Sequence, residues 1–338
     1  MKKCIFVFMV LMIPASLFAA DRVVLFEDFT NCGCPPCWSA EPQVNAFVNA
    51  NLPNGNLAVI RTHVNWPTAN DPIYVANPTE QAVRKAQYGV SGVPYFKMDG
   101  IVNCSASSLQ SSFDSRVSVP AIIDIEVARN GDNTSGTMSI MVVAEEDPQW
   151  TVPMMLWPIL VEDNIPGVGY WSGSVFEQAF RDNILGPYGE EINFSGPFPD
   201  TLYFDADYEI DSSWDPEELY LATFVQCHYQ QSQHEVENAH WAKFTELQTG
   251  IEDGQWNGWT EPVLSVGPNP SAGTFSITAS VPAGTQGTVQ VFDISGRTVA
   301  SGNAGDLNSV TVNEAGVYMV RLTDSNGISV TKSVAVVR

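Results

Sequence analysis

The spacing of apolar residues changes along the chain, and the first part of the chain mixes two periods. The apolar run Val23–Phe29 is typical of a buried strand, and it precedes a stretch in which Val44, Phe47 and Val48 recur at helical spacing. Strand and helix patterns continue to alternate after it. Because such alternation is typical of α/β folds, we expect an α/β domain over residues 21–119.

The apolar period becomes two after residue 119, which indicates half-buried strands. Ile123 and Ile125 fall on one face of a strand, and Asp124 and Glu126 fall on the other. Three further apolar runs fit strands: Met155–Val161, Leu202–Phe204 and Leu219–Cys227. Short strands in succession favour a sandwich, so we expect a β-sandwich domain over residues 120–248.

A second all-β pattern ends the chain. Residues 249–262 are polar and contain glycine and tryptophan, which is typical of a linker. Beyond them, Tyr318, Val320 and Leu322 alternate with their neighbours. The pattern predicts a small all-β sandwich over residues 263–338. The expected fold class is therefore an α/β domain followed by two all-β sandwich domains.

The first twenty residues have the pattern of an export signal. Lys2 and Lys3 give a positive start, Ile5–Leu17 is apolar, and Ala19 and Ala20 are the small residues of a cleavage site. The apolar run is shorter than the roughly 20 residues that cross a bilayer, and no later run is as long. We expect an exported chain without a transmembrane segment in its mature part.

The charge excludes one class of partner. The formal net charge is -23 at pH 7, and removal of the signal, with its two lysines, makes it more negative. Such a chain repels phosphate backbones and anionic lipids. We therefore expect no nucleic acid as a partner.

Cys34 and Cys37 form a CxxC motif between a strand and a helix, the context that favours dithiol chemistry over zinc binding. A cysteine at a helix start is favoured as thiolate, and one a turn later can close a disulfide with it. Cys34 would attack and Cys37 would resolve. Pro35 and Pro36 remove two N–H groups that could stabilise the thiolate. The alternative is a plain structural disulfide or a pair of reduced core cysteines.

The remaining cysteines leave alternatives open. Six cysteines occur in the chain, and Cys4 lies in the signal, so the exported part holds an odd number. Cys32 could trap Cys34 or act as a third exchange partner, or it is a spare loop thiol. Cys104 and Cys227 fit small apolar core residues, or they pair with each other.

Several features around the CxxC motif resemble the thioredoxin superfamily. Asp28 lies six residues before Cys34, at the place of the superfamily's buried carboxylate, and Pro42 lies at the place of its helix-kinking proline. Residues 88–100, YGVSGVPYFKMDG, resemble the segment whose cis-proline faces the disulfide, which here is Pro94. The resemblance implies a thioredoxin-like domain over residues 21–119, in which Asp28 assists proton transfer and Pro94 shapes the docking edge.

A second resemblance extends beyond this domain. It rests on four segments: HVNWPTANDPIYVAN at 63–77, FEQAFRD at 176–182, WDPEELYLATFVQ at 214–226 and HEVENA at 234–239. Together they resemble the exported bacterial family related to outer membrane protein 28. That family implies a thioredoxin-like domain joined to a β-sandwich, with surface attachment or binding suggested as often as redox work.

The end of the chain resembles the type IX secretion C-terminal sorting domain. Pro268, Asn269 and Pro270 open it, VFDISGR at 291–297 predicts a hairpin, and GVYMVRL at 316–322 predicts a strand. The resemblance implies that the type IX secretion machinery recognises residues 263–338. The protein would then be secreted or attached to the outer cell surface.

Other polar clusters do not match a metal or cofactor site. His228, His234 and His240 are spaced by six residues, which fits no common zinc pattern. Asp205 and Asp207 alternate on a strand without the glycine and spacing of a calcium loop. We expect neither a metal nor a cofactor.

Two functions follow from the sequence. The first is a surface thiol-disulfide oxidoreductase whose catalytic residues are Cys34, Cys37, Pro94 and Asp28 and whose partners are protein thiols or disulfides. The second is a non-catalytic, adhesin-like surface protein that binds a ligand and holds a structural disulfide. Exposure outside the cell, where reducing partners are scarce, favours the second.

Overall fold

The computed structural model describes residues 20–232, 234–247, 262–281, 286–325, 327 and 329–337. The expected export signal lies outside the described residues except for Ala20, and so does the expected linker except for Pro262. No helix within the described ranges combines the length and the apolar character that crossing a bilayer requires.

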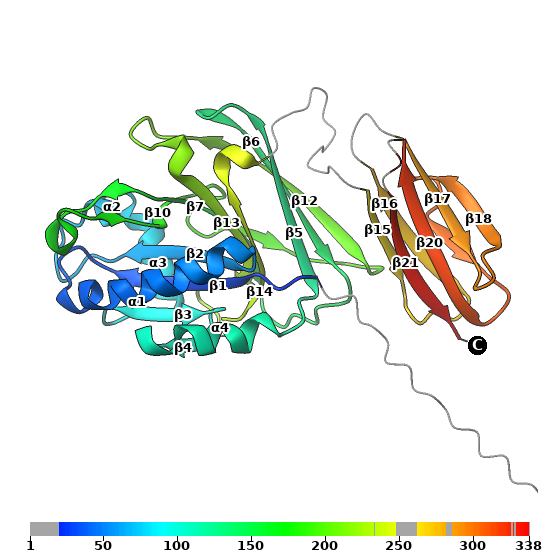
Figure 1. Ribbon diagram of the computed structural model, residues 1–338, viewed down its shortest axis with the longest axis horizontal. Helices are drawn as coiled ribbons and strands as arrows, with labels where there is room; N and C mark the ends of the chain where they lie inside the picture. The colour runs from blue at the N-terminus through cyan, green and yellow to red at the C-terminus, as the bar shows by residue number, and fades with distance from the viewer. Residues whose placement is uncertain are drawn as a thin grey trace, which may run out of the picture.

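A nine-stranded mixed sheet is the centre of the molecule (Figure 1). Its strands run in the order β14-β13-β7-β10-β2-β1-β3-β4, and β11 pairs with β7. Their bounds are β1 Val24–Thr30, β2 Leu57–His63, β3 Tyr95–Met98, β4 Val102–Cys104, β7 Met154–Glu162, β10 Ala179–Asn183, β11 Glu190–Ile192, β13 Leu219–Cys227 and β14 Val236–Lys243. Four helices accompany them: α1 Pro35–Asn51, α2 Pro72–Ala76, α3 Pro78–Gln87 and α4 Leu109–Val117.

The strands β1 and β2 lie at the middle of this sheet and are buried on both faces. One face, which includes Phe26 and Val59, packs against α1 and α4. The other face, which includes Leu25 and Ile60, packs against side chains of β7 and β13, such as Trp157. Both faces are covered, which explains why the first part of each strand, Val24–Phe26 and Leu57–Ile60, is a continuous apolar run.

The sheet curls so far that its two halves face each other. Five steps separate β14 from β1 in the strand order, which would place them roughly 24 Å apart in a flat sheet with about 4.8 Å between strands. The backbone N–H of Val23 nevertheless donates to Oδ1 of Asn238 on β14 at 2.9 Å. The apolar side chains between the halves form one continuous core.

A separate three-stranded sheet covers the outer face of β7 and β13. It consists of β12 Asp200–Glu209, β6 Ser135–Ala144 and β5 Ile123–Gly131, in that order. Ile125 and Ile140 on this sheet pack against Leu156 and Leu221. The alternation seen after residue 119 is confirmed, since Ile123 and Ile125 are buried in this core.

The expected fold class, an α/β thioredoxin-like domain followed by two all-β sandwich domains, is wrong. Strand β10 pairs with β2 through Ala179 and Arg61, so one sheet holds strands from both sides of residue 120. The strands β7 and β13, which were expected in a separate sandwich, cover the inner face of β1 and β2. The molecule is mostly β-structure in several sheets. The expected boundary at residues 119 and 120 stays a prediction.

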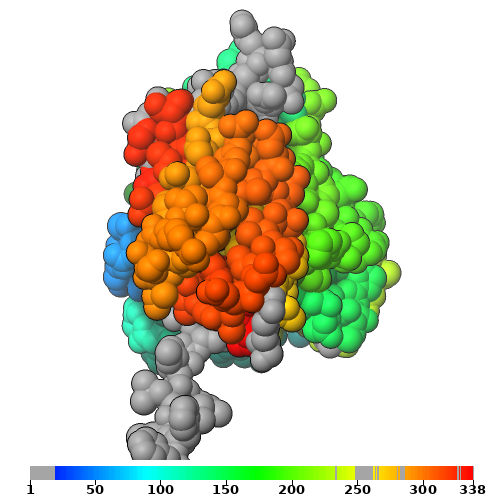
Figure 2. Space-filling model, turned by 90° about the vertical axis from the view of Figure 1, so that its right-hand side faces the viewer, coloured from blue at the N-terminus to red at the C-terminus, as the bar shows by residue number. Residues whose placement is uncertain are grey.

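The C-terminal unit packs two small sheets around its own core. One sheet has the order β15 Val263–Gly267, β16 Thr274–Ser280, β19 Ser309–Thr311, and the other has the order β18 Thr298–Asn303, β17 Gly287–Phe292, β20 Gly316–Asp324, β21 Ser329–Val336. The hairpin predicted at 291–297 is confirmed, with the N–H of Asp293 donating to the carbonyl of Arg297 at 2.9 Å. Figure 2 shows this unit, in orange and red, facing the viewer.

Candidate functional site

Cys34 and Cys37 form a disulfide at the start of α1, with an S–S distance of 2.11 Å and 5.3 Å between the Cα atoms. Cys34 is the N-cap of the helix, and its sulfur accepts a hydrogen bond from the N–H of Cys37 at 3.1 Å. Pro35 and Pro36 occupy the first helical turn, where a missing N–H costs no helical hydrogen bond. The CxxC spacing therefore places both sulfurs on one side of a single turn.

The disulfide is buried. Cys34 is 2% exposed and Cys37 is 3% exposed, and they belong to an apolar cluster that contains Trp171 and Phe176. Trp171 and Phe176 lie far along the chain from the two cysteines. The sequence alone does not show that these residues enclose the disulfide. This burial leaves the two cysteines little contact with solvent.

A hairpin from the middle of the chain covers the disulfide, and we call it the cover hairpin. Its two short strands are β8 Ile165–Pro166 and β9 Val175–Phe176, and a turn of 3-10 helix, Gly169–Trp171, lies at its tip. The N–H of Tyr170 donates to the carbonyl of Cys32 at 3.0 Å. The Trp171 ring lies edge-on to the ring of Trp38 on α1, with 5.3 Å between centroids.

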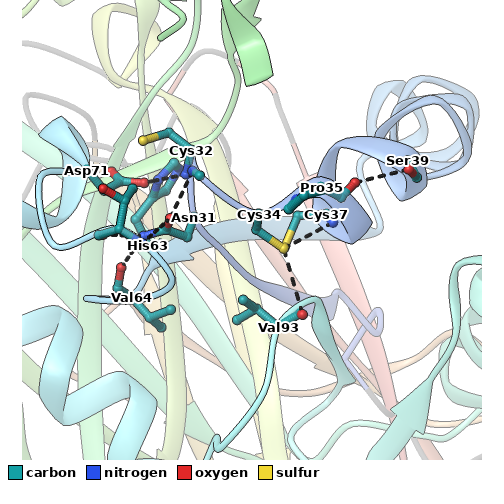
Figure 3. The surroundings of a disulfide bond; sticks show 12 residues. Asn31, Cys32, Cys34, Pro35, Cys37, Ser39, His63, Val64, Asp71 and Val93 are labelled. Carbon is teal, nitrogen blue, oxygen red and sulfur yellow. Dashed lines mark hydrogen bonds and ion pairs between the residues drawn. A yellow bond between two sulfur atoms is a disulfide. The ribbon is translucent and has the colours of Figure 1, made fainter. Parts of the chain in front are cut away.

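The loop that contains Pro94 passes beside the disulfide. The Val93–Pro94 peptide bond is cis. The carbonyl oxygen of Val93 lies 3.7 Å from Sγ of Cys34 (Figure 3). The loop before β3 therefore contributes a backbone carbonyl to the surroundings of the first cysteine.

Asp28 on β1 is a buried carboxyl group, 3% exposed, and lies opposite Arg61 of β2. Burial raises its pKa to about 7, Arg61 lowers it and Glu41 raises it. Arg61 is itself paired with Glu41 at 2.6 Å. Within the described part of the chain, Oδ1 of Asp28 has no hydrogen-bond partner. This arrangement holds an ionisable group that can carry a proton near neutral pH.

A cavity of about 10 Å³ for the centre of a water molecule lies next to the cover hairpin. That volume is enough for a single water molecule. Its walls come from β1, α1, β2 and the hairpin: Thr30, Glu41, Arg61, His63, Trp171, Phe176 and Glu177. The space is too small for an organic ligand.

Hydrogen bonds join the side chains of His63 and Asp71 and the backbone of Cys32. The sequence did not single out Asp71. Nδ1 of His63 lies 2.8 Å from Oδ2 of Asp71, and the N–H of Cys32 donates to that same oxygen at 2.6 Å. Asp71 is also the N-cap of α2 and accepts from Ile73 and Tyr74. Burial favours a raised pKa for Asp71, but His63 and the hydrogen bonds hold it below the usual value. The pair Asp71–Pro72 is a helix-start signal that could have identified this residue.

Cys32 is unsuited to exchange. Burial and, to a smaller extent, the neighbouring Asp71 raise the pKa of its thiol to about 12. Its sulfur points away from the disulfide in Figure 3. Cys104 and Cys227 do not form a disulfide with each other. Of the alternatives left open by the sequence, the spare loop thiol describes Cys32 best.

The three histidines after residue 227 have separate surroundings. His234 lies 3.9 Å from the sulfur of Cys227, and His228 contacts the ring of Tyr229. Burial lowers the pKa of His240 to about 4. In the described ranges no group of three or more histidine, cysteine, aspartate or glutamate side chains is arranged to hold a metal ion.

Comparisons with known proteins address the fold and the C-terminal unit. No curated protein matches the sequence. HBP35 of Porphyromonas gingivalis has a similar fold, with a TM-score of 0.57 and 15% identity over 94% of this chain and 99% of that chain. A structural-genomics protein from Agrobacterium tumefaciens has a TM-score of 0.44 and 12% identity over 69% of this chain and 100% of that chain. At these identities the first likeness concerns the fold alone.

Residues 265–337 match the family model described as the secretion system C-terminal sorting domain. This match confirms the C-terminal resemblance that the motifs around 291–297 and 316–322 indicated. The machinery that handles such a domain is the type IX secretion system. The chain therefore carries a C-terminal sorting domain of type IX secretion, and it is exported and then secreted or attached to the outer cell surface.

Proposed function

We propose that the protein is a non-catalytic binding protein of the cell surface, in which the Cys34–Cys37 disulfide is a structural crosslink. The observation that carries this proposal is the burial of both half-cystines, 2% and 3% exposed, beneath Trp171. Thiol exchange requires an attacking thiolate to reach a sulfur of the disulfide. A disulfide with so little solvent contact meets this requirement poorly while its cover is in place.

The location of the protein outside the cell supports the same proposal. Outside the cell, disulfides persist because the thiols that would reduce them are scarce. An exported chain can therefore keep the start of α1 crosslinked to its own first turn. The disulfide would then fix the conformation of the loop from Asn31 to Cys34, which carries the backbone contacts of Cys32 to Asp71 and Tyr170.

A binding role has support in the surface around the disulfide. Trp38, Val168 and Tyr170 are 37%, 43% and 48% exposed, although each is large and apolar. Trp38, near the start of α1, contacts the Trp171 ring, and Tyr170 precedes Trp171 in the turn at the hairpin tip. Exposed aromatic side chains are enriched in protein interfaces, where they contribute much of the binding energy.

The test of this proposal is a turnover assay on the mature chain. Insulin disulfides are reduced by dithiothreitol in the presence of the protein, and precipitation of the insulin B chain is followed. We expect the rate with wild-type protein to equal the rate with a Cys34→Ser, Cys37→Ser variant. Catalysis that exceeds the variant by tenfold or more would contradict the proposal.

A second candidate, a thiol-disulfide oxidoreductase, is favoured by one specific observation. Asp28 is fully buried, its pKa is raised to about 7, and its Oδ1 has no partner among the described residues. A structural role does not require such a carboxyl group, whereas proton transfer near neutral pH does. The thioredoxin relationship, which the fold comparison leaves open, would assign the group this role.

In that candidate the reduced protein acts on a partner's disulfide. The Cys34 thiolate attacks one sulfur, and the partner's other sulfur leaves with the electron pair of the broken bond. The Cys37 thiol gives its proton to the ionised Asp28 and attacks Cys34, which restores the Cys34–Cys37 disulfide and releases the partner with two thiols. Pro94 would shape the edge where the partner docks. A Cys34→Ser variant without turnover, beside an active wild type, would establish this function.

A further inference from the structure

The hairpin over the disulfide differs from the sheet around it in how it is held. Its base belongs to the sheet: Oδ1 of Asp163 accepts from the backbone N–H and from Nε2 of Gln178, at 2.5 and 2.8 Å. The carbonyl of Gln178 in turn accepts from the N–H of Arg61 on β2 at 2.9 Å. Polar contacts on both of its sides therefore fix the base.

The tip, residues 167–174, is held differently. In the part of the chain that the structure describes, the bond from Tyr170 N–H to the carbonyl of Cys32 is the one hydrogen bond that joins the tip to other segments. Other contacts of the tip are those of the Trp171 ring, which lies 5.3 Å from Trp38 and 5.6 Å from Phe176, and the close approach of Gly169 to Cys32. Because Trp171 is 2% exposed, its ring supplies most of the tip's buried apolar contact.

The backbone of the tip permits movement about the base. Gly169 and Gly173 both have positive φ, at 61° and 87°, and Gly167 lies at the start of the tip. Glycine has the widest backbone freedom of all residues, so a segment that contains three of them reorganises readily. Segments with few hydrogen bonds to the rest of a protein open at a lower free energy than its core does.

We propose that the tip, residues 167–174, forms a hinged lid over the Cys34–Cys37 disulfide, with its hinge at Gly167 and Gly173 and with the Trp171 ring as the latch. In the closed state the latch separates the sulfurs from thiols in solution. In the open state the ring leaves the cluster of Cys34, Cys37 and Phe176, and the disulfide can be attacked. This inference goes beyond the proposed function, because it assigns control of thiol access whether the disulfide is structural or catalytic.

The chemistry of the open state is ordinary thiol exchange. A dithiothreitol thiolate attacks one sulfur of the disulfide, and the other sulfur leaves with the electron pair and takes a proton from water. The second thiol of the reagent then closes its ring and releases the first cysteine. The protein gains two thiols, and the reagent is oxidised to its cyclic disulfide.

The test measures how fast dithiothreitol reduces this disulfide in the folded mature chain. Samples are quenched with an alkylating reagent, and the peptide that contains Cys34 and Cys37 is quantified by mass spectrometry. We expect Trp171→Ala to raise the rate about tenfold or more, because the variant has no latch. The matched control is Tyr170→Ala, which removes an exposed ring from the same turn and should change the rate by no more than about twofold.

A measurement on the wild type alone tests the lid even if the Trp171→Ala variant does not fold. Reduction is followed at urea concentrations well below the unfolding transition. A local opening exposes little new surface, so its rate should be almost independent of urea, whereas global unfolding would make the rate rise steeply. A steep urea dependence in the wild type, or equal rates for a folded Trp171→Ala variant and the wild type, would overturn the lid. Neither outcome bears on insulin turnover, so the lid and the proposed function fail separately.

Discussion

The guanidinium of Arg84 on α3 donates a 3.0 Å hydrogen bond to Oε1 of Gln226 on β13, although 142 residues separate the two. The same guanidinium donates twice to Oε1 of Glu27 on β1, at 2.6 and 3.0 Å. It also lies 5.0 Å from the Trp157 ring and 5.1 Å from the Phe224 ring. One buried cation thus joins the N-terminal helices to strands that the sequence placed in another domain.

Replacement of Arg84 by alanine should therefore destabilise the whole body built on the nine-stranded sheet. Glu27 would remain fully buried without its cation, and removal of one partner of a buried ion pair costs about 3 to 5 kcal/mol. We expect the free energy of unfolding of Arg84→Ala, measured in urea, to be lower than that of the wild type by this amount. Probes on α1 and on β13 should move together.

The control for this variant is Arg297→Ala. Arg297 pairs with Asp293, but its side chain is 71% exposed, and exposed pairs contribute less than about 1 kcal/mol. If the two arginine variants unfold at the same urea concentration, or if the α1 and β13 probes separate, Arg84 does not join these segments into one body.

Removal of the disulfide should cost little stability. Its ring spans only three positions of the sequence, and closing so short a loop restrains the unfolded chain by about 2 kcal/mol. We expect the Cys34→Ser, Cys37→Ser variant to lose about this much unfolding free energy in urea. Cys104→Ser, which changes a free thiol at the sheet edge, is the control for cysteine loss. A loss above about 5 kcal/mol would show that the disulfide organises more than its own turn.

Asp28 makes the stability of the protein depend on pH in a predictable direction. Its pKa is raised from 3.8 to about 7 in the native state, so between these values the native protein holds a proton that the unfolded chain has lost. This contribution to stability is complete below about pH 4 and disappears as the pH rises to about 7. A shift of about three pKa units corresponds to at most about 4 kcal/mol.

An Asp28→Asn variant lacks this dependence. The unfolding free energy of wild type and variant is measured in urea at pH 5 and pH 8. As the pH rises from 5 to 8, the stability of the variant relative to the wild type should increase. Other carboxyl groups with raised pKa values, such as Glu80 and Glu126, are present in both proteins, so their contribution cancels when the two stabilities are subtracted. A constant difference at both pH values would mean that Asp28 ionises normally.

Gly169 should tolerate alanine less well than Gly173. Both have positive φ, which costs about 1 kcal/mol for alanine. A Cβ at Gly169 would also lie 2.3 Å from the carbonyl oxygen of Cys32, whereas a Cβ at Gly173 meets nothing within 4 Å. We expect Gly169→Ala to cost about 1 to 3 kcal/mol more than Gly173→Ala in thermal or urea unfolding. Equal costs would contradict the close approach of the hairpin to Cys32.

Local features of the fold could be predicted from the sequence because local chemistry determines them. Asp99 and Gly100 form a tight turn between β3 and β4, with φ of 45° and 69°, and an Asp-Gly pair is typical of such turns because these residues tolerate positive φ. The helix after Cys34 begins where Pro35 and Pro36 can occupy its first turn. Asp28 is buried on β1, and the carbonyl of Val93, next to Pro94, lies 3.7 Å from the sulfur of Cys34.

The long-range pairings could not be predicted from the same patterns. An apolar run such as Met154–Glu162 is buried on both faces, and periodicity does not reveal which sheet such a strand joins. The single pairing of Ala179 with Arg61 decides that β10 continues the sheet of β2. Trp171 was missed for the same reason, since it lies more than 130 positions after Cys37 in the sequence and reaches the disulfide only through a long-range hairpin.

The most direct test of the central claim, a buried structural disulfide in a surface protein, is an equilibrium titration of the mature chain with glutathione. The redox state of Cys34 and Cys37 is measured by alkylation and mass spectrometry across a series of reduced and oxidised glutathione. We predict that the disulfide stays oxidised throughout, with a potential below about -300 mV, as structural disulfides have. A midpoint near -230 mV or above, within the range of glutaredoxins and oxidising enzymes, would contradict the account.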